Sequence, residues 1–116
     1  MGGKASRDKG KRFELMVAHW LQKNGFDEAM RSAQHSGKAG DAADVVGMPG
    51  IHLECKAVEQ ARLHDWLEQA TRDSAGTGNK PVIIWKRNRM PWLAIMLADD
   101  FMEMYKNGNT RESSED

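Results

Sequence analysis

Asp44, Glu54 and Lys56 are the residues whose types and spacing are best suited to chemistry. Glu54 and Lys56 lie two positions apart in a β-favouring run, and a strand places residues at that spacing on one face. If the chain folds back at Met48-Pro49-Gly50, Asp44 lies nearly opposite Glu54, with both carboxylates on the same face. Desolvating two carboxylates is unfavourable without compensation, which a divalent cation would supply. The pattern therefore predicts a metal-dependent phosphoryl-transfer site, and the alternative is an ordinary cross-strand salt bridge.

Phosphodiester hydrolysis requires an activated water and neutralisation of the charge that develops on the phosphate, and a divalent metal supplies both. Mg²⁺ is bound by few carboxylates and several waters, so Asp44 and Glu54 are a sufficient protein contribution. Lys56 is placed to orient the water or to stabilise the developing negative charge. The backbone carbonyl of Cys55 is a candidate further ligand, whereas its side chain is expected to face the core without thiol chemistry.

The elements that must position these residues follow from hydrophobic periodicity. Phe13, Met16, Val17, Trp20 and Leu21 form one stripe of an amphipathic helix, which Gly25 ends. By similar patterns we expect a helix over 7–24, a strand over 26–32, a hairpin within 40–59, a helix over 61–74, strands over 81–85 and 92–97, and a last helix from Asp99 to Gly108. This order, α-β-β-β-α-β-β-α, predicts an α/β fold with helices packed against a sheet.

Length and composition place the chain among ordinary globular domains. Its 116 residues, 29% charged and 40% hydrophobic, suit one domain, with a folded core over 7–106, a flexible segment before Arg7 and a disordered tail after Gly108. A single cysteine excludes a disulfide within the chain, and the four histidines are dispersed without zinc spacing. No apolar run resembles a secretion signal or a membrane span, so a cytoplasmic protein is the expectation.

The net charge of zero conceals two basic regions. Lysines and arginines crowd the N-terminus and recur at 80–89, while the acids collect around the predicted site and in the C-terminal tail. Basic regions flanking an acidic site suit an enzyme that binds a nucleic-acid backbone, although charge runs are commonly solvated faces. The polar loop 32–40 lacks the spacing of a phosphate-binding P-loop but could contact phosphates. The candidate DNA-binding residues are Lys9, Lys11, Arg12, Arg31, Ser36, Lys38, Lys86, Arg87 and Arg89.

Glu14 and Gln69 lie beside the apolar stripes of the first and second predicted helices. Taken alone, each is better interpreted as an exposed helix residue.

In this order and spacing, the residues resemble the PD-(D/E)XK nuclease superfamily, and most of all archaeal-type Holliday junction resolvases and their phage-encoded relatives. The likeness spans roughly residues 7 to 105 and rests on K-G-K-R-F-E, R-S-A-Q-H-S-G, L-E-C-K, W-L-E-Q-A and V-I-I-W-K-R-N-R. The resemblance implies a restriction-endonuclease-like core, a mixed four-stranded sheet flanked by helices, that hydrolyses DNA with Mg²⁺ or Mn²⁺.

The resemblance also assigns roles to residues. Asp44 and Glu54 become metal ligands, Lys56 the catalytic lysine, and Glu14 an acid on the helix that supports the metal. Gln69 matches a helix glutamine seen near the site in many members, and Arg31 and Ser36 match loop positions associated with substrate phosphate or catalysis. The chain departs from the pattern in Asp41-Ala42-Ala43-Asp44, with no proline before the acid, so Asp41 is a further candidate that would share the metal, although Asp44 fits the hairpin register better.

Related resolvases act as homodimers, because symmetric nicks across a four-way junction require two sites. Candidate dimer residues are Met90, Trp92, Met96, Met102 and Met104, although methionine and tryptophan at such spacing more often belong to a core. The leading hypothesis is a Mg²⁺-dependent nuclease that resolves four-way DNA junctions. The alternatives are another branched-DNA or flap nuclease of the superfamily, a non-catalytic DNA-binding module, and an interaction domain whose charged strand face is a salt-bridge network.

Overall fold

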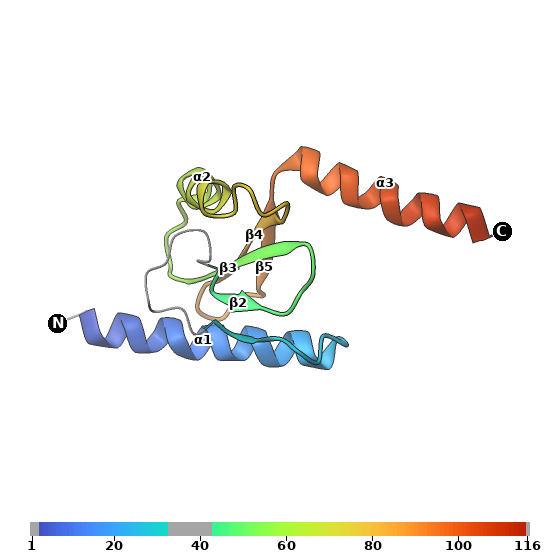
Figure 1. The fold of residues 1–116 in the computed structure, drawn as a ribbon. Helices are drawn as coiled ribbons and strands as arrows, with labels where there is room; N and C mark the ends of the chain where they lie inside the picture. Colours follow the sequence, from blue (N-terminus) through green and yellow to red (C-terminus); the bar gives the residue numbers. More distant parts are fainter. Residues whose placement is uncertain (1–2, 33–42, 116) are drawn as a thin grey trace.

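The computed structural model describes residues 3–32 and 43–115, with side chains described as far as Gly108 (Figure 1). Its elements follow the predicted order. They are α1 (Gly3–Lys23), β1 (Met30–Arg31), β2 (Val45–Val46), β3 (Ile51–Ala57), α2 (Leu63–Asp73), β4 (Lys80–Lys86), β5 (Leu93–Met96) and α3 (Ala98–Glu115). None of the helices in these described ranges has the length and apolarity that a membrane span requires.

The strands form one mixed sheet in the order β1-β2-β3-β4-β5. The β3 and β4 strands are parallel, with α2 as the crossover between them, and the other neighbours are antiparallel. The expected mixed sheet is confirmed, and its five strands match the five in the predicted order, one more than the four that the resemblance implied. One edge strand is the short β1, in which Met30 pairs with Val46 and Arg31 with Val45.

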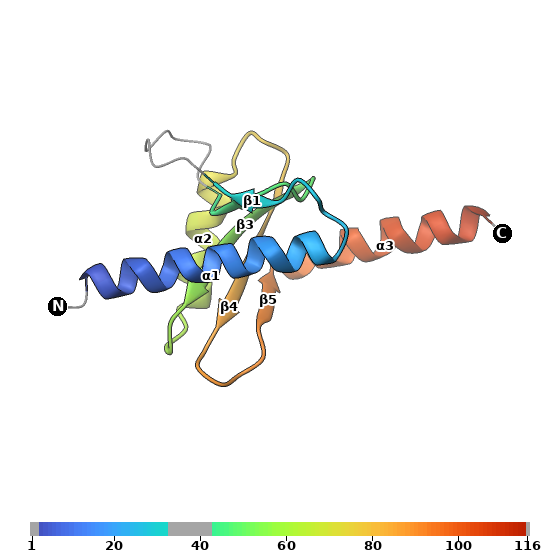
Figure 2. The same cartoon turned by 90° about the horizontal axis from the view of Figure 1, so that it is seen from below.

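Helices α1 and α2 cover opposite faces of the sheet (Figures 1 and 2). Phe13, Val17 and Leu21 of α1 pack with Leu53 and Ile84 in one core cluster. On the other face, Leu67 and Ala70 of α2 pack with Ile83 and Trp85. Alternate residues of β4 therefore point to opposite faces and both are buried, which explains the continuous apolar run in the sequence.

The helix ends differ from the prediction. Residues 3–6 belong to α1, where the sequence suggested a flexible segment. Lys4 Nζ forms an ion pair with Asp8 Oδ2, one helical turn later, at 3.6 Å. The last helix continues through Gly108 to Glu115, where the sequence suggested a disordered tail. One interior glycine disfavours a helix by only about 1 kcal/mol, so it does not by itself end one. This helix extends away from the sheet (Figures 1 and 2).

The turn between β2 and β3 depends on Gly47. Its φ is +103°, a conformation that other residues rarely adopt. A Cβ placed there would lie 2.5 Å from the Ala29 Cα, because the segment before β1 passes directly over the turn. The glycine therefore allows the segment before β1 to pass close to the backbone of the β2–β3 turn.

Candidate active site

Asp44 and Glu54 meet where β2 begins beside β3. Val45 pairs with Leu53 in an antiparallel register, so the preceding Asp44 lies opposite Glu54 as the alternation predicted. The Asp44 amide donates to the Leu53 carbonyl at 2.9 Å, and Asp44 Oδ2 accepts a hydrogen bond of 2.8 Å from the Cys55 amide. These two bonds fix the Asp44 carboxyl group against β3.

The environment of Asp44 favours its protonated form. The pKa of Asp44 is raised to about 7, mainly by burial and next by the negative charge of Glu54. The charge of Glu14 and a hydrogen bond to Glu54 raise it further, whereas the hydrogen bond from the Cys55 N–H lowers it. A divalent cation would relieve the same repulsion by replacing the proton. The donor set therefore fits a hard divalent metal ion.

Cys55 contributes its backbone on one side and its side chain on the other. In a strand, the N–H and C=O of one residue point toward the same neighbouring strand, so the Cys55 carbonyl faces the side on which its N–H meets Asp44. The side chain packs against the α1 core cluster, as predicted. Burial raises the pKa of its thiol well above the ordinary value, so the thiol stays protonated and unreactive.

Lys56 follows Glu54 by two residues on β3 and faces α2. Its Nζ is 5.8 Å from the ring centroid of Trp66, which holds the ammonium group by a cation–π contact. Lys56 also lines a cavity of about 350 Å³, and Ser6, Lys9 and Gly10 of α1 line the same cavity. A substrate phosphate in this cavity would lie between a strand lysine and a helix lysine.

Glu14 of α1 lies near enough to Asp44 for its charge to act on that residue. Its Oε1 accepts a hydrogen bond of 2.7 Å from Arg31 Nε on β1, and the two side chains are only 19% and 26% exposed. Its charge contributes to the raised pKa of Asp44. The helix acid and the predicted phosphate-binding arginine thus form an ion pair with each other, a pairing that sequence reasoning missed because it joins residues 17 positions apart.

A histidine and an aspartate without a predicted role lie beside Glu54. His52, on β3, is 4% exposed, and its Nε2 is 2.8 Å from Glu54 Oε2. Asp73, at the end of α2, brings a third ligand atom, and the three lie within 4.8 Å of one another. The alternation His52, Glu54 already placed these two on one face, but only the packing of α2 brings Asp73 to them. Gln69 is exposed one helical turn before Asp73.

The candidate DNA-binding residues occupy different parts of the surface. Lys9, Arg12 and Lys86 line a cavity of about 190 Å³ between α1 and the ends of β3 and β4. Lys11 and Arg89 are exposed, and Arg87 lies over the Trp85 ring at 5.8 Å. The predicted residues Ser36 and Lys38, and the candidate ligand Asp41, lie outside the described residues.

Comparison with known proteins identifies the family. The family model described as "Phage putative PDDEXK endonuclease" matches residues 5–114. No curated protein sequence matches the chain significantly. Among solved structures, Hjc from Archaeoglobus fulgidus, a Holliday junction resolvase from an archaeal hyperthermophile, superimposes with a TM-score of 0.59 and 27% identity over 75% of this chain and 76% of that one. The mixed sheet, the three helices and this match confirm the restriction-endonuclease-like fold. With nearly its whole length matched, the chain belongs to the phage PDDEXK endonuclease family.

Proposed function

We propose that this protein is a Mg²⁺- or Mn²⁺-dependent endonuclease that cuts four-way DNA junctions. The observation that carries the proposal is the meeting of Asp44 and Glu54 across β2 and β3, with Lys56 two residues further along the strand. The family supports DNA cleavage, and the likeness to an archaeal resolvase supports a branched substrate.

Each site residue has a proposed role that follows from its position. Asp44, Glu54 and the Cys55 carbonyl would hold the metal, which supplies an activated water and neutralises charge on the phosphate. Lys56 orients the attacking water or stabilises the negative charge that develops on the scissile phosphate. Glu14 keeps the site acidic and is itself positioned by Arg31. Gln69 supports the site from α2.

DNA would approach over the basic end of α1. Lys9 connects the two cavities described above, since it lines both the one beside Lys56 and the one formed with Arg12 and Lys86. Lysine and arginine there would bind phosphates without reading sequence. Lys11, Arg87 and Arg89 are exposed nearby candidates, and Ser36 and Lys38 remain candidates from the sequence.

Symmetric cleavage of a junction requires two sites, so the proposal includes a homodimer. Trp92 and Met96 are unsuitable for its interface because both pack against the α1 core cluster, where the Trp92 and Phe13 ring centroids are 5.0 Å apart. Met90, Met102 and Met104 stay exposed. Phe101 and Tyr105 are further exposed apolar residues on α3, which also carries Met102 and Met104. Sedimentation of the wild type and of Phe101→Glu/Tyr105→Glu tests this. A dimer that becomes a monomer supports α3 as the interface, and a monomeric wild type contradicts the homodimer.

The cleavage test uses a labelled four-way junction, a flap and a linear duplex. We expect paired symmetric nicks in the junction with Mg²⁺ or Mn²⁺, none with EDTA, and far slower cutting of the linear duplex. Asp44→Asn, Glu54→Gln and Lys56→Met should each abolish cleavage, whereas Glu68→Gln, at an exposed α2 position, should not. Equal rates on all three substrates would contradict junction selectivity. Junction binding without cleavage under either metal would favour a DNA-binding module.

A further inference from the structure

A second group of metal-ligating side chains lies on the α2 side of Glu54. It consists of His52 and Glu54 on β3 and Asp73 at the C-terminal end of α2. One ligand atom from each residue lies within 4.8 Å of the other two, and His52 Nε2 is 2.8 Å from Glu54 Oε2. Of these residues, only Glu54 has been assigned to the Asp44 metal site.

The separations suit a single ion. Nitrogen and carboxylate ligands bind a transition metal at about 2.0–2.2 Å, so neighbouring donors around one ion lie roughly 3 Å apart. The His52–Glu54 distance is already close to that value, and the Asp73 ligand atom lies within 4.8 Å of both. The burial of His52, only 4% exposed, fixes its ring in the strand face and makes it a preorganised donor.

The donor types discriminate between metals. Mg²⁺ prefers oxygen ligands and retains several waters, whereas Mn²⁺, Co²⁺ and Zn²⁺ accept an imidazole together with carboxylates. Two carboxylates and one neutral imidazole give a charge that a divalent ion balances. A site built on His52 therefore favours transition metals over Mg²⁺.

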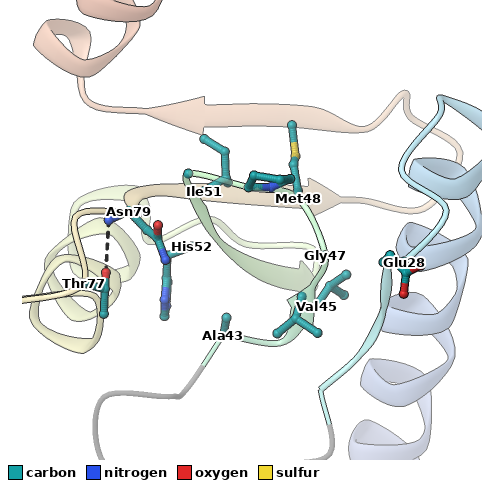
Figure 3. Close-up of a pocket in the computed structure, with 12 residues that line it drawn as sticks. Glu28, Ala43, Val45, Gly47, Met48, Ile51, His52, Thr77 and Asn79 are labelled. Atoms are coloured by element: carbon teal, nitrogen blue, oxygen red, sulfur yellow. Dashed lines mark hydrogen bonds between the residues drawn. The ribbon is translucent and has the colours of Figure 1, made fainter.

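The group is open to solvent on one side. His52 lines a cavity of about 440 Å³ together with Ala43, Thr77 and Asn79. Figure 3 shows the His52 ring directed between Ala43 and Thr77, at the wall of this cavity. A hydrated ion can thus approach the group from the His52 side, where the cavity also has room for water molecules.

We propose that His52, Glu54 and Asp73 form a second divalent-cation site, selective for Mn²⁺-, Co²⁺- or Zn²⁺-type ions and sharing Glu54 with the Asp44 site. The inference deepens the proposed function, because a cation on this side of Glu54 would fix the carboxylate that also binds the catalytic ion. Binding at this second site does not itself require DNA or cleavage, so the two proposals can be tested separately.

The experiment measures Co²⁺ binding to the metal-free full-length protein by visible absorption and by calorimetry. Asp44→Asn removes the first site and keeps the second, so it should still bind one Co²⁺ with a spectrum typical of nitrogen ligation. In that background His52→Gln and Asp73→Asn should each weaken binding by about tenfold or more. The matched controls His64→Gln and Asp65→Asn change exposed residues of the same types on α2 and should leave binding unchanged.

The outcomes distinguish the two proposals. Loss of all Co²⁺ binding in Asp44→Asn, or unchanged affinity in both His52→Gln and Asp73→Asn, would overturn the second site and leave the nuclease proposal intact. Mg²⁺ competing with Co²⁺ at equal concentration would overturn its selectivity. Conversely, a wild-type protein that cleaves no DNA, together with Co²⁺ binding that His52→Gln and Asp73→Asn weaken, would support the second site while the nuclease proposal fails. If buried His52→Gln does not fold by circular dichroism, Asp73→Asn, at the edge of the site, decides the matter.

Discussion

Folding takes the Asp44 carboxyl group out of water and places it beside two other acids, Glu54 and Glu14. The ionised form of Asp44 is therefore less favourable in the metal-free folded protein than in the unfolded chain. A bound divalent cation reverses this balance, because it attracts the carboxylates that otherwise repel one another. The residue thus links proton binding, metal binding and stability.

The first prediction concerns this link. The pKa of Asp44 is higher in the folded protein, about 7, than its ordinary value of 3.8, so the folded state binds the proton more tightly. The stabilisation from that proton is present at low pH and is lost as the pH rises from about 4 through about 7. Relative to Asp44→Asn, the metal-free wild type should lose up to about 4 kcal/mol of unfolding free energy over that range, since each pKa unit corresponds to about 1.4 kcal/mol.

Urea unfolding in EDTA at several pH values measures this difference. Titrating groups that do not interact with Asp44 are common to both proteins and cancel in the comparison. Parallel pH profiles for the wild type and Asp44→Asn would show that the carboxyl is not perturbed in this way.

The sequence predicted Asp44, Glu54 and Lys56 as a group because strand alternation and the Pro49-Gly50 turn are local features with a definite geometry. It could not predict Asp73, since that requires knowing that α2 crosses back over β3 and ends beside His52. Nor could it pair Glu14 with Arg31, because both are ordinary surface types until α1 docks on the sheet edge.

At the scale of elements, two connections hold the site together. One is the backbone crossing at Gly47, where the segment before β1 passes over the β2–β3 turn, and the other is the ion pair between α1 and β1. Neither contains Asp44, Glu54 or Cys55. Substitutions at either connection should therefore lower the free energy of unfolding, and should affect catalysis only through the geometry of the site.

Gly47→Ala tests the crossing. The substitution places a Cβ 2.5 Å from the Ala29 backbone in a residue whose φ is +103°, so both strain and a clash disfavour the folded state. We expect a loss of about 2–4 kcal/mol in unfolding free energy. Gly50→Ala is the control, since its φ of +83° brings conformational strain but its Cβ would meet nothing within 4 Å. Chemical denaturation measures both, and an equal loss in the two variants would refute the importance of the close approach.

A double-mutant cycle tests the α1–β1 ion pair. Arg31→Met leaves Glu14 partly buried beside two other acids without its partner, and should destabilise the metal-free protein by about 2 kcal/mol. Adding Glu14→Gln should recover most of that loss, because the unpaired charge is removed. Stabilities from urea unfolding give the coupling energy. Additive effects of the two substitutions would mean that the pair makes no net interaction.

At the scale of the whole molecule, charge and shape are distributed unevenly. The structure measures 57 × 32 × 27 Å along its principal axes, and the N-terminal end of α1 and the C-terminal end of α3 extend past the sheet in opposite directions (Figure 2). Lys9, Arg12 and Lys86 gather on the side of the sheet that α1 covers. The formal net charge is zero, so association with DNA must depend on this local concentration of positive charge.

Salt dependence measures that contribution. Lys9→Gln, Arg12→Gln and Lys86→Gln should each weaken junction binding and reduce the slope of log affinity against log salt by up to about 0.9 for each phosphate that the variant no longer neutralises. Lys106→Gln, on the exposed part of α3, is the control and should leave the slope unchanged. Fluorescence anisotropy with a labelled junction in EDTA separates binding from cleavage. Slopes that match the control would place the DNA on another surface.

The antiparallel pairing of β2 with β3, beside the parallel pairing of β3 with β4, has a consequence for how the nuclease matures. Glu14, Asp44 and Glu54 come from α1, the start of β2 and the middle of β3, which meet only when segments distant along the chain have docked. Parallel pairing further requires α2 to be in place, and such non-local contacts form late in folding. A nascent or partly folded chain would therefore lack the metal site that we propose, and hydrolysis would require the complete tertiary structure.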